Sequence, residues 1–288
     1  MSAEKKNLIQ IQNEEESRRI LENLKRIRHK IVVMSGKGGV GKSTVAANLA
    51  IALAKKGRKV GLLDMDLTGP NIPKMLGVED ARLFGSEEGI LPVKVMDNLH
   101  VISSAYMLPH KEMAIIWRGP MKIGAIQQLL AQVYWGELDY LIIDLPPGTS
   151  DEPLSVAQSI PETDGAVIVT TPQEVSLLDI YKSMNFAEKL KMKIIGIIEN
   201  MSGFVCPHCG ERSDIFKSGG GKAAAERYKV PFLGSIPIDP KIVEDADAGK
   251  PFVTQEKDSE AARAFYKVVE RIEEIVEGSK KKAPKRKR

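Results

Sequence analysis

Residues 36–43 read Gly-Lys-Gly-Gly-Val-Gly-Lys-Ser, which matches the phosphate-loop pattern G-x-x-x-x-G-K-[ST]. A β-rich run, IVVM (31–34), enters this stretch, and a helical pattern over 43–56 leaves it. The glycines let successive backbone N–H groups turn toward phosphate oxygens, and the start of a helix adds partial positive charge. Lys42 is expected to reach the β- and γ-phosphates, and the Ser43 hydroxyl to ligate Mg²⁺. The stretch therefore predicts a nucleotide-binding loop formed by Gly36, Lys37, Gly38, Gly39, Val40, Gly41, Lys42, Ser43 and Thr44.

Outward from this loop, short apolar runs alternate with helical patterns. The runs are 31–34, 59–64, 100–104, 139–144, 165–170, 193–200 and 232–236, and the helical patterns cover 43–56, 120–134, 174–191, 219–228 and 258–277. Runs that are apolar at nearly every position are typical of strands buried on both faces. The pattern predicts an α/β fold with a doubly wound, mostly parallel β-sheet flanked by helices, the P-loop NTPase fold. It forms one domain over 30–277, and the Gly- and Pro-rich stretch 65–98 is expected to be a mobile connection.

The two ends of the chain differ from this domain. Apolar residues recur at helical spacing within the charged stretch 13–29, which predicts an exposed helix inside an N-terminal extension, 1–29. The last nine residues hold seven Lys or Arg, so removing them changes the formal net charge from +4 to −3. Residues 278–288 are therefore interpreted as a basic, disordered tail, which either keeps the protein in solution or holds an anionic surface or nucleic acid. The charge of the rest of the chain does not support DNA binding by the main domain.

Composition narrows the class further. The chain has two cysteines in 288 residues, so it is not a disulfide scaffold. No window approaches the ~18 consecutive apolar residues of a membrane span, and the N-terminus is too charged for a secretory signal. We expect a cytoplasmic protein.

Carboxylates follow two of the predicted strands. Asp144 ends the apolar run LIID and precedes the stiff turn Pro146-Pro147-Gly148. Asp64 and Asp66 end another strand, at the carboxyl edge where ligands of parallel sheets bind. An isolated Asp at a strand end is more often a turn former. Three of them downstream of a phosphate loop favour a magnesium and water site.

Cys206-Pro207-His208-Cys209-Gly210 has the C-P-x-C-G pattern of a metal knuckle, whose spacing lets both sulfurs face one ion. A thioredoxin-like redox pair is the competing interpretation, but that motif opens a helix after a strand. Here a loop is expected from Asn200 through residues 211–214. A zinc site and a [4Fe–4S] cluster both require four protein ligands, and one chain supplies two cysteines. The site is therefore shared between chains, or completed by His208, by other residues or by a partner.

Taken together, these motifs resemble a known family. KGGVGKST, with its extra lysine Lys37, resembles the deviant Walker A motif of the MinD/ParA/nitrogenase-iron-protein class of NTPases. Within that class the chain resembles the Mrp/ApbC iron–sulfur cluster carrier ATPases through the stretches DMDLTGPNIP (64–73), WRGPM (117–121), DLPPGTSDE (144–152), ENMSGFVCPHCG (199–210) and PIDP (237–240). The resemblance implies that the separate N-terminal domain of longer members is missing from this protein.

The resemblance implies roles for individual residues. Lys37 would cross a dimer interface to the partner's nucleotide, and Asp66 would help to position the hydrolytic water. Asp64 and Asp144 would hold the magnesium shell together with Ser43, partly through water. The adenine base would lie beside three further residues: Asn200, Pro237 and Asp239.

The resemblance also implies an activity. The protein would hydrolyse ATP with Mg²⁺, hold a [4Fe–4S] cluster between Cys206 and Cys209 of two subunits, and pass it from a cluster donor to apo iron–sulfur proteins. Zinc in the same place is the alternative for that metal site. Two alternative functions remain: a ParA- or MinD-like positioning ATPase, and a zinc-bridged nucleotide-switch dimer. MinD-like membrane attachment is disfavoured because no large apolar residue follows Val276.

Overall fold

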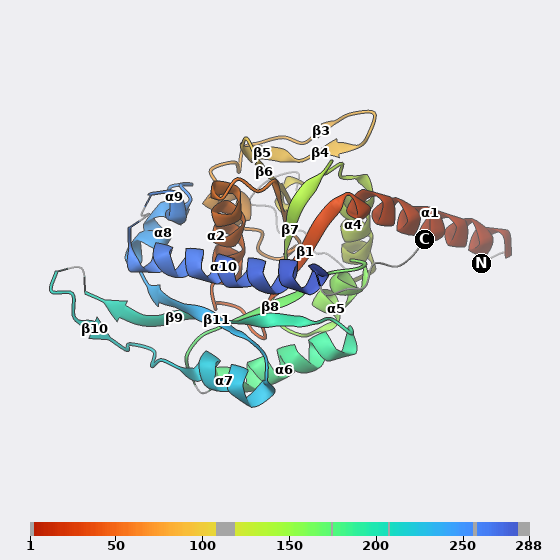
Figure 1. Ribbon diagram of the computed structural model, residues 1–288. Helices are drawn as coiled ribbons and strands as arrows, with labels where there is room; N and C mark the ends of the chain where they lie inside the picture. The colour runs from red at the N-terminus through yellow and green to blue at the C-terminus, as the bar shows by residue number, and fades with distance from the viewer. Residues whose placement is uncertain (1–2, 108–118, 174, 207, 256–257, 282–288) are drawn as a thin grey trace.

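The computed structural model describes residues 3–107, 119–173, 175–206, 208–255 and 258–281. Within these residues the chain forms a nine-stranded, mostly parallel sheet and a separate two-stranded hairpin (Figure 1). The hairpin consists of β3 (Phe84–Gly85) and β4 (Ile90–Leu91). The strands of the large sheet are β1 (Ile27–Met34), β2 (Val60–Asp64), β5 (Val93–Met96), β6 (Leu99–Ser103), β7 (Leu138–Asp144), β8 (Gly165–Thr170), β9 (Ile194–Val205), β10 (Arg212–Ser213) and β11 (Phe232–Ile238).

The strand order places the strand that precedes the phosphate loop at the centre of the sheet. It runs β10–β9–β8–β1–β7–β2–β6–β5, and β11 pairs with β9 as well. All pairs are parallel except β5 with β6 and β10 with β9. Because the carboxyl ends of the parallel strands meet at one edge, the loops that follow β1, β2, β7 and β9 lie at that edge.

Helices cover both faces of the sheet. One face packs against α2 (Lys42–Lys55), α9 (Phe252–Gln255) and α10 (Glu260–Lys281), with the short helices α3 (Ile72–Met75) and α8 (Pro240–Asp247) beside them. The other face packs against α1 (Ala3–Lys25), α4 (Gly119–Gln132), α5 (Asp151–Gln158), α6 (Val175–Lys189) and α7 (Gly220–Tyr228). A 3₁₀ turn covers Ser104–Met107. Among the described residues, no helix is long and apolar enough to cross a bilayer.

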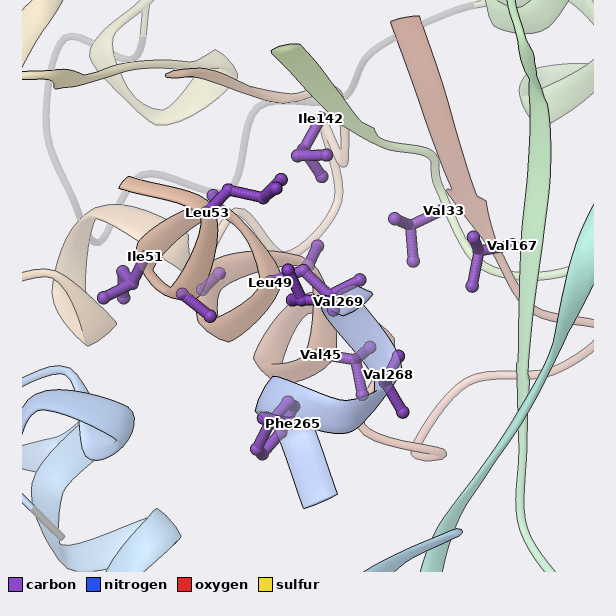
Figure 2. Close-up of a cluster of buried hydrophobic side chains, with 14 of the residues drawn as sticks. Val33, Val45, Leu49, Ile51, Leu53, Ile142, Val167, Phe265, Val268 and Val269 are labelled. Carbon is purple, nitrogen blue, oxygen red and sulfur yellow. The ribbon is translucent and has the colours of Figure 1, made fainter. Parts of the chain in front are cut away.

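The core follows from the two-residue period of the strands. In β1, Ile31 and Val33 point into the cluster shared with α2 and α10, whereas Val32 and Met34 point into the opposite cluster. Figure 2 shows the first cluster, in which Val45 and Leu49 of α2 lie near α10. Each buried aliphatic side chain contributes about 1.5–3 kcal/mol relative to exposure, so this packing fixes the position of the helix that begins in the phosphate loop.

The predicted fold class is confirmed, and each of the seven apolar runs forms a strand. The predicted helix over 13–29 is wrong at both ends, because α1 spans Ala3–Lys25 and β1 already begins at Ile27. The ladder with β7 continues down to the pair Ile27 and Leu138. His29 stacks on Tyr140 with ring centroids 5.1 Å apart, so tertiary pairing overrides the helical pattern of the sequence there.

Two further expectations about the chain are corrected. The stretch 65–98, predicted to be a connection, contains α3, the β3–β4 hairpin and β5, whose two- to four-residue length leaves little periodicity to recognise. The basic tail was predicted to begin at residue 278, but α10 continues to Lys281. Residues 282–288 lie outside the described part of the chain, as do Trp117 and Arg118 of the WRGPM stretch.

The loop expected from Asn200 through residue 214 is also wrong. β9 continues to Val205, and β10 returns antiparallel beside it, with Arg212 opposite Val205. Met201 and Gly203 adopt positive φ values of 57° and 77° along this stretch. These irregular residues break the apolar alternation, which is why the pattern ends earlier than the strand does.

Candidate nucleotide and metal site

The phosphate loop joins β1 to α2 at the carboxyl edge of the sheet. Gly39 and Gly41 have φ values of 78° and 79°, a conformation that L side chains rarely adopt. A Cβ at Gly41 would lie 2.2 Å from Asn200 Nδ2, so only glycine fits. Gly36 is equally constrained, because a Cβ there would lie 2.2 Å from the carbonyl oxygen of Asp179. Gly38, Val40 and Thr44 complete the loop and the first turn of α2, as predicted.

A buried ion pair lies directly under this loop. Lys42 Nζ is 2.7 Å from Asp144 Oδ1, and the two side chains are 6% and 0% exposed. Ser43 Oγ donates to the other carboxylate oxygen, Oδ2, at 2.6 Å. The chain therefore brings the predicted phosphate-binding lysine, the predicted magnesium-binding hydroxyl and the Asp at the end of β7 into one cluster.

Asp64 lies on the neighbouring strand, directly opposite Asp144 in the β2–β7 register. Its Oδ2 accepts a hydrogen bond from Ser103 Oγ at 2.8 Å, and its Oδ1 accepts one from the Asp66 backbone N–H at 3.1 Å. Burial, together with the charge of Asp144, raises the pKa of Asp64 to about 7. Burial also raises the pKa of Asp144, although the Lys42 ammonium opposes that shift. The Asp64 and Asp144 carboxylates share this buried edge of the sheet with the Lys42 ammonium.

We expect the contribution of Asp64 to the stability of the protein, measured without nucleotide or metal, to fall as the pH rises from about 4 to about 7. The folded-state pKa of Asp64 lies near 7, above the ordinary value of about 3.9. The unfolded chain therefore releases this proton first, which favours unfolding across that window. The melting temperature of Asp64→Asn, compared with that of the native protein, should therefore increase as the pH is raised from 4.5 to 7.5. Asp97→Asn, which changes an exposed carboxylate, serves as the control. An unchanged pH dependence in Asp64→Asn would contradict this assignment.

Asp66 is held in the loop that follows β2. Its Oδ1 accepts hydrogen bonds from the Thr68 N–H, the Thr68 hydroxyl and the Gly69 N–H at 3.1, 2.7 and 3.1 Å. The side chain is 8% exposed and lies two residues from Asp64. The Asp66 carboxylate therefore lies near the candidate magnesium ligands, and it is hydrogen-bonded to its own loop.

The Lys37 side chain contacts helix α6 of its own subunit. Its Nζ donates to Ser176 Oγ at 2.9 Å and lies 3.7 Å from Asp179 Oδ2, both on α6. The side chain is 37% exposed, so it is partly open to solvent next to the phosphate loop. The reach of Lys37 across a dimer interface stays a prediction.

The three predicted adenine-site residues lie at the same edge. Asn200 Nδ2 donates to the Val40 carbonyl at 2.9 Å, which ties β9 to the phosphate loop. Ile236 of β11 is opposite Asn200, so the next residue, Pro237, lies beside it. Asp239 Oδ1 accepts from the Lys241 N–H at 3.0 Å and caps α8. The Asp239 carboxylate thus has a structural contact that the sequence did not predict.

The two cysteines lie at the tip of the β9–β10 hairpin. Cys206 is half-buried, Cys209 is exposed, and both are free thiols. The Cys206 N–H donates to the Glu211 carbonyl and the Gly210 N–H donates to the Cys206 carbonyl, each at 2.9 Å. Backbone N–H groups of Cys209 and His208 lower the pKa of the Cys206 thiol, which favours the thiolate that binds metals. The pair does not open a helix, so the geometry does not support the redox-pair interpretation.

Sequence reasoning missed several supporting residues. Ser103 bonds Asp64, and Ser176 and Asp179 hold Lys37, although no local pattern marks any of them. Glu199 is fully buried and accepts hydrogen bonds from the Gly219 and Gly221 N–H groups at 2.9 and 2.5 Å. It joins β9 to the start of α7. An acidic residue directly before Asn200 is the signal that could have drawn attention to it.

The loop, the ion pair and the sheet order together define a P-loop NTPase of the MinD/ParA type. The fold is similar to the MinD cell-division ATPase of Pyrococcus furiosus, at 29% identity and a TM-score of 0.63 over 86% of this chain and 99% of that one. It is also similar to a nucleotide-binding protein of Archaeoglobus fulgidus solved in complex with ADP, at 44% identity and a TM-score of 0.74 over 82% and 92% of the two chains.

Residues 26–273 match the family model described as "ParA: NUBPL iron-transfer P-loop NTPase", and the chain belongs to that family. It is 56% identical over 262 residues to a protein named iron-sulfur cluster carrier protein in Methanocaldococcus jannaschii, covering 91% of this chain and 90% of the relative. A protein of the same name in Saccharolobus solfataricus is 50% identical over 256 residues, covering 89% and 86%. The family resemblance drawn from the motifs is confirmed.

Proposed function

We propose that this protein is an ATP-binding and ATP-hydrolysing iron–sulfur cluster carrier that holds a cluster between two subunits and transfers it to apo-proteins. The observation that carries the proposal is a pair of sites joined by one strand. β9 contacts the phosphate loop through Asn200 and, six residues later, presents Cys206. The names of the relatives support the same function.

ATP binding is supported by the phosphate loop and by Lys42. Lys42 pairs with Asp144. A bound triphosphate offers this ammonium a second anion, so Lys42 moves from the carboxylate toward the β- and γ-phosphates. The start of α2 then faces the phosphates with its free N–H groups, where an anion is stabilised.

Magnesium fits the residues that surround this lysine. Asp64 and Asp144 face each other on adjacent strands, and the pKa of Asp64 is raised by burial and, after it, by the charge of Asp144. Carboxylate and hydroxyl oxygens are the ligands that Mg²⁺ prefers. Ser43, Asp64 and Asp144 would hold the ion, Asp64 and Asp144 partly through water, and the ion would neutralise charge on the transferred phosphoryl group.

Hydrolysis is proposed to depend on the dimer. Lys37 belongs to the phosphate loop, and its partners are the Ser176 hydroxyl and the Asp179 carboxylate, 3.7 Å away. The charge that develops on the γ-phosphate is a stronger attraction for this lysine, as it is for an arginine finger supplied in trans. Asp66 would orient the attacking water. Asn200, Pro237 and Asp239 would contact the adenine side of the nucleotide.

The cluster is the cargo, and its ligands are Cys206 and Cys209. One chain offers two thiolates at an exposed hairpin, whereas a [4Fe–4S] cluster takes four. A symmetric dimer supplies four, so one cluster per dimer is proposed, with zinc as the alternative metal in the same place. The free thiols also suit a reducing compartment, and we place the protein in the cytoplasm.

Anaerobic reconstitution tests the carrier function. Protein incubated with iron, sulfide and a thiol reductant is expected to turn brown and to bind iron and sulfide in equal amounts. Mixing with an apo-ferredoxin should then move the cluster to the acceptor, detected by the acceptor's own spectrum. Colourless protein that retains zinc under these conditions would contradict the carrier function and favour the zinc-bridged dimer.

Lys37→Ala is expected to reduce ATP hydrolysis strongly while leaving ATP affinity within about threefold of the native value. Asp66→Ala should likewise reduce hydrolysis. If Lys37 acts on the partner's nucleotide, a mixed dimer of the two variants contains one composite site with both residues intact. Mixing equal amounts should then restore up to about a quarter of native activity, measured as phosphate release. Activity equal to the mean of the two parents would contradict a shared active site.

A further inference from the structure

A groove of about 480 Å³ lies beside β11, and Pro237, one of the predicted adenine contacts, is among its lining residues. Within the described part of the chain, β11 pairs only with β9, so no strand lies at its outer edge. Side chains from both faces border the groove: Lys267 from α10 on one face and Lys222 from α7 on the other. Because side chains from both faces of the sheet border it, the groove lies at the edge of the sheet formed by β11.

The groove is strongly basic. Five cationic side chains line it against a single carboxylate, Glu260; the cations are Arg212, Lys222, Arg263, Lys267 and Arg271. Glu260 is occupied by Arg212, 3.3 Å away. Lys222 and Lys267 make no ion pair among the residues that the structure describes. The positive charge is therefore left largely uncompensated.

Helix α10 lies along β11 and runs in the opposite direction. At one end of the groove, Arg271 Nη1 donates to the carbonyls of Phe232 and Leu233 at 3.1 and 2.9 Å. At the other end, Glu260 meets Arg212, which also donates to the Ser202 carbonyl at 3.2 Å. Gly234 permits this close approach, because a Cβ there would lie 3.0 Å from Val268 Cγ2.

The spacing of the cations matches an extended chain. Arg263, Lys267 and Arg271 recur every four residues, so their side chains form one stripe along α10 with a rise of about 6 Å between neighbours. In a β-strand, side chains on one face recur about every 6.6 Å. A strand beside β11 with an acidic residue at every second position would bring successive carboxylates close to successive cations.

We propose that this groove receives an extended, acidic segment of a partner protein, which adds as a further strand to the outer edge of β11 beyond Leu233, where Arg271 no longer occupies the carbonyls. Backbone hydrogen bonds to β11 would supply affinity, and carboxylates facing the α10 stripe would supply selectivity. The groove ends at Arg212, in the strand that follows the two cysteines, so a docked partner lies at the base of the cysteine hairpin. Binding itself needs neither nucleotide nor cluster.

The probe is a fluorescein-labelled (Glu-Val)₅ peptide, titrated with the full chain in 50 mM salt and followed by anisotropy. Saturable binding is expected, and Arg263→Glu/Lys267→Glu should weaken it at least tenfold. Lys55→Glu/Lys189→Glu reverses two exposed charges outside the groove and should leave the affinity within twofold. Unchanged melting temperature and ATP affinity establish that both variants are folded. No saturation below 1 mM, or equal weakening by both variants, would overturn the proposal.

Two methylated peptides separate strand addition from charge attraction alone. In an added strand, alternate backbone N–H groups face β11 and the others face away. N-methylation of all Val nitrogens, or of all Glu nitrogens, should therefore weaken one peptide at least tenfold and spare the other. Equal affinities of the two peptides would overturn strand addition, leaving cations that only keep the sheet edge from self-pairing. Tighter binding of a dT₁₀ oligonucleotide at the same residues would assign the groove to nucleic acid instead.

Discussion

Lys42→Ala is expected to abolish ATP hydrolysis and to weaken MgATP binding by at least about tenfold. Lys42, at the end of the phosphate loop, lies 2.7 Å from Asp144. Hydrogen bonds to charged groups contribute about 1.5–3 kcal/mol, and each 1.4 kcal/mol corresponds to a tenfold change in affinity. Isothermal titration with a slowly hydrolysed ATP analogue measures the loss. Lys55→Ala, at an exposed position in the last turn of the same helix, is the matched control and should bind normally.

The same substitution leaves Asp144 buried without its cation. Removing one partner of a buried pair costs about 3–5 kcal/mol, so Lys42→Ala should also lower the free energy of unfolding. Lys42→Ala/Asp144→Asn removes the unpaired charge and should recover part of that loss while remaining inactive. Native ATP affinity in either folded variant would contradict the assignment of Lys42.

Cys206→Ser or Cys209→Ser is expected to eliminate the bound cluster and its transfer while ATP binding persists. Each single substitution removes two of four ligands from a symmetric dimer, and a serine hydroxyl stays protonated and binds iron poorly. Iron and sulfide content after anaerobic reconstitution should fall to background in both variants. ATP affinity should stay native, since the hairpin contributes no residue to the phosphate loop.

His208→Ala is the matched control for the cysteine variants. His208 is exposed in the same turn, between the two cysteines. If the four thiolates of a dimer hold the cluster, this variant keeps it. Loss of the cluster in His208→Ala would contradict the four-cysteine site and make the histidine a ligand. A variant that lacks both cysteines yet still transfers a cluster would contradict the carrier function altogether.

Much of the fold could be predicted because the central strands are buried on both faces. Runs such as 139–144 and 165–170 are apolar throughout, so their type and their place in a parallel sheet followed from composition alone. The phosphate loop could also be predicted. Its backbone requires glycine at fixed positions, such as Gly41 next to Asn200, so the motif is visible in the sequence. Local constraints of this kind produce patterns that can be recognised in the sequence.

Features that depend on contacts between distant residues left no such mark. The first residues of β1 form a strand only because β7 lies beside them, with His29 against Tyr140. The cysteine hairpin depends on β10, a two-residue strand that has no pattern of its own. Lys37 could be singled out by its motif, but its contacts with Ser176 and Asp179 arise from the way α6 packs against the loop.

Native mass spectrometry of the anaerobically reconstituted protein tests the central claim most directly, because it weighs subunits and cluster together. We predict a dimer carrying one [4Fe–4S] cluster, or about half a cluster per chain. The cluster should be absent from Cys206→Ser and present in Lys42→Ala. A monomer that carries a complete cluster, or a dimer whose cluster survives the loss of the cysteines, would contradict the account.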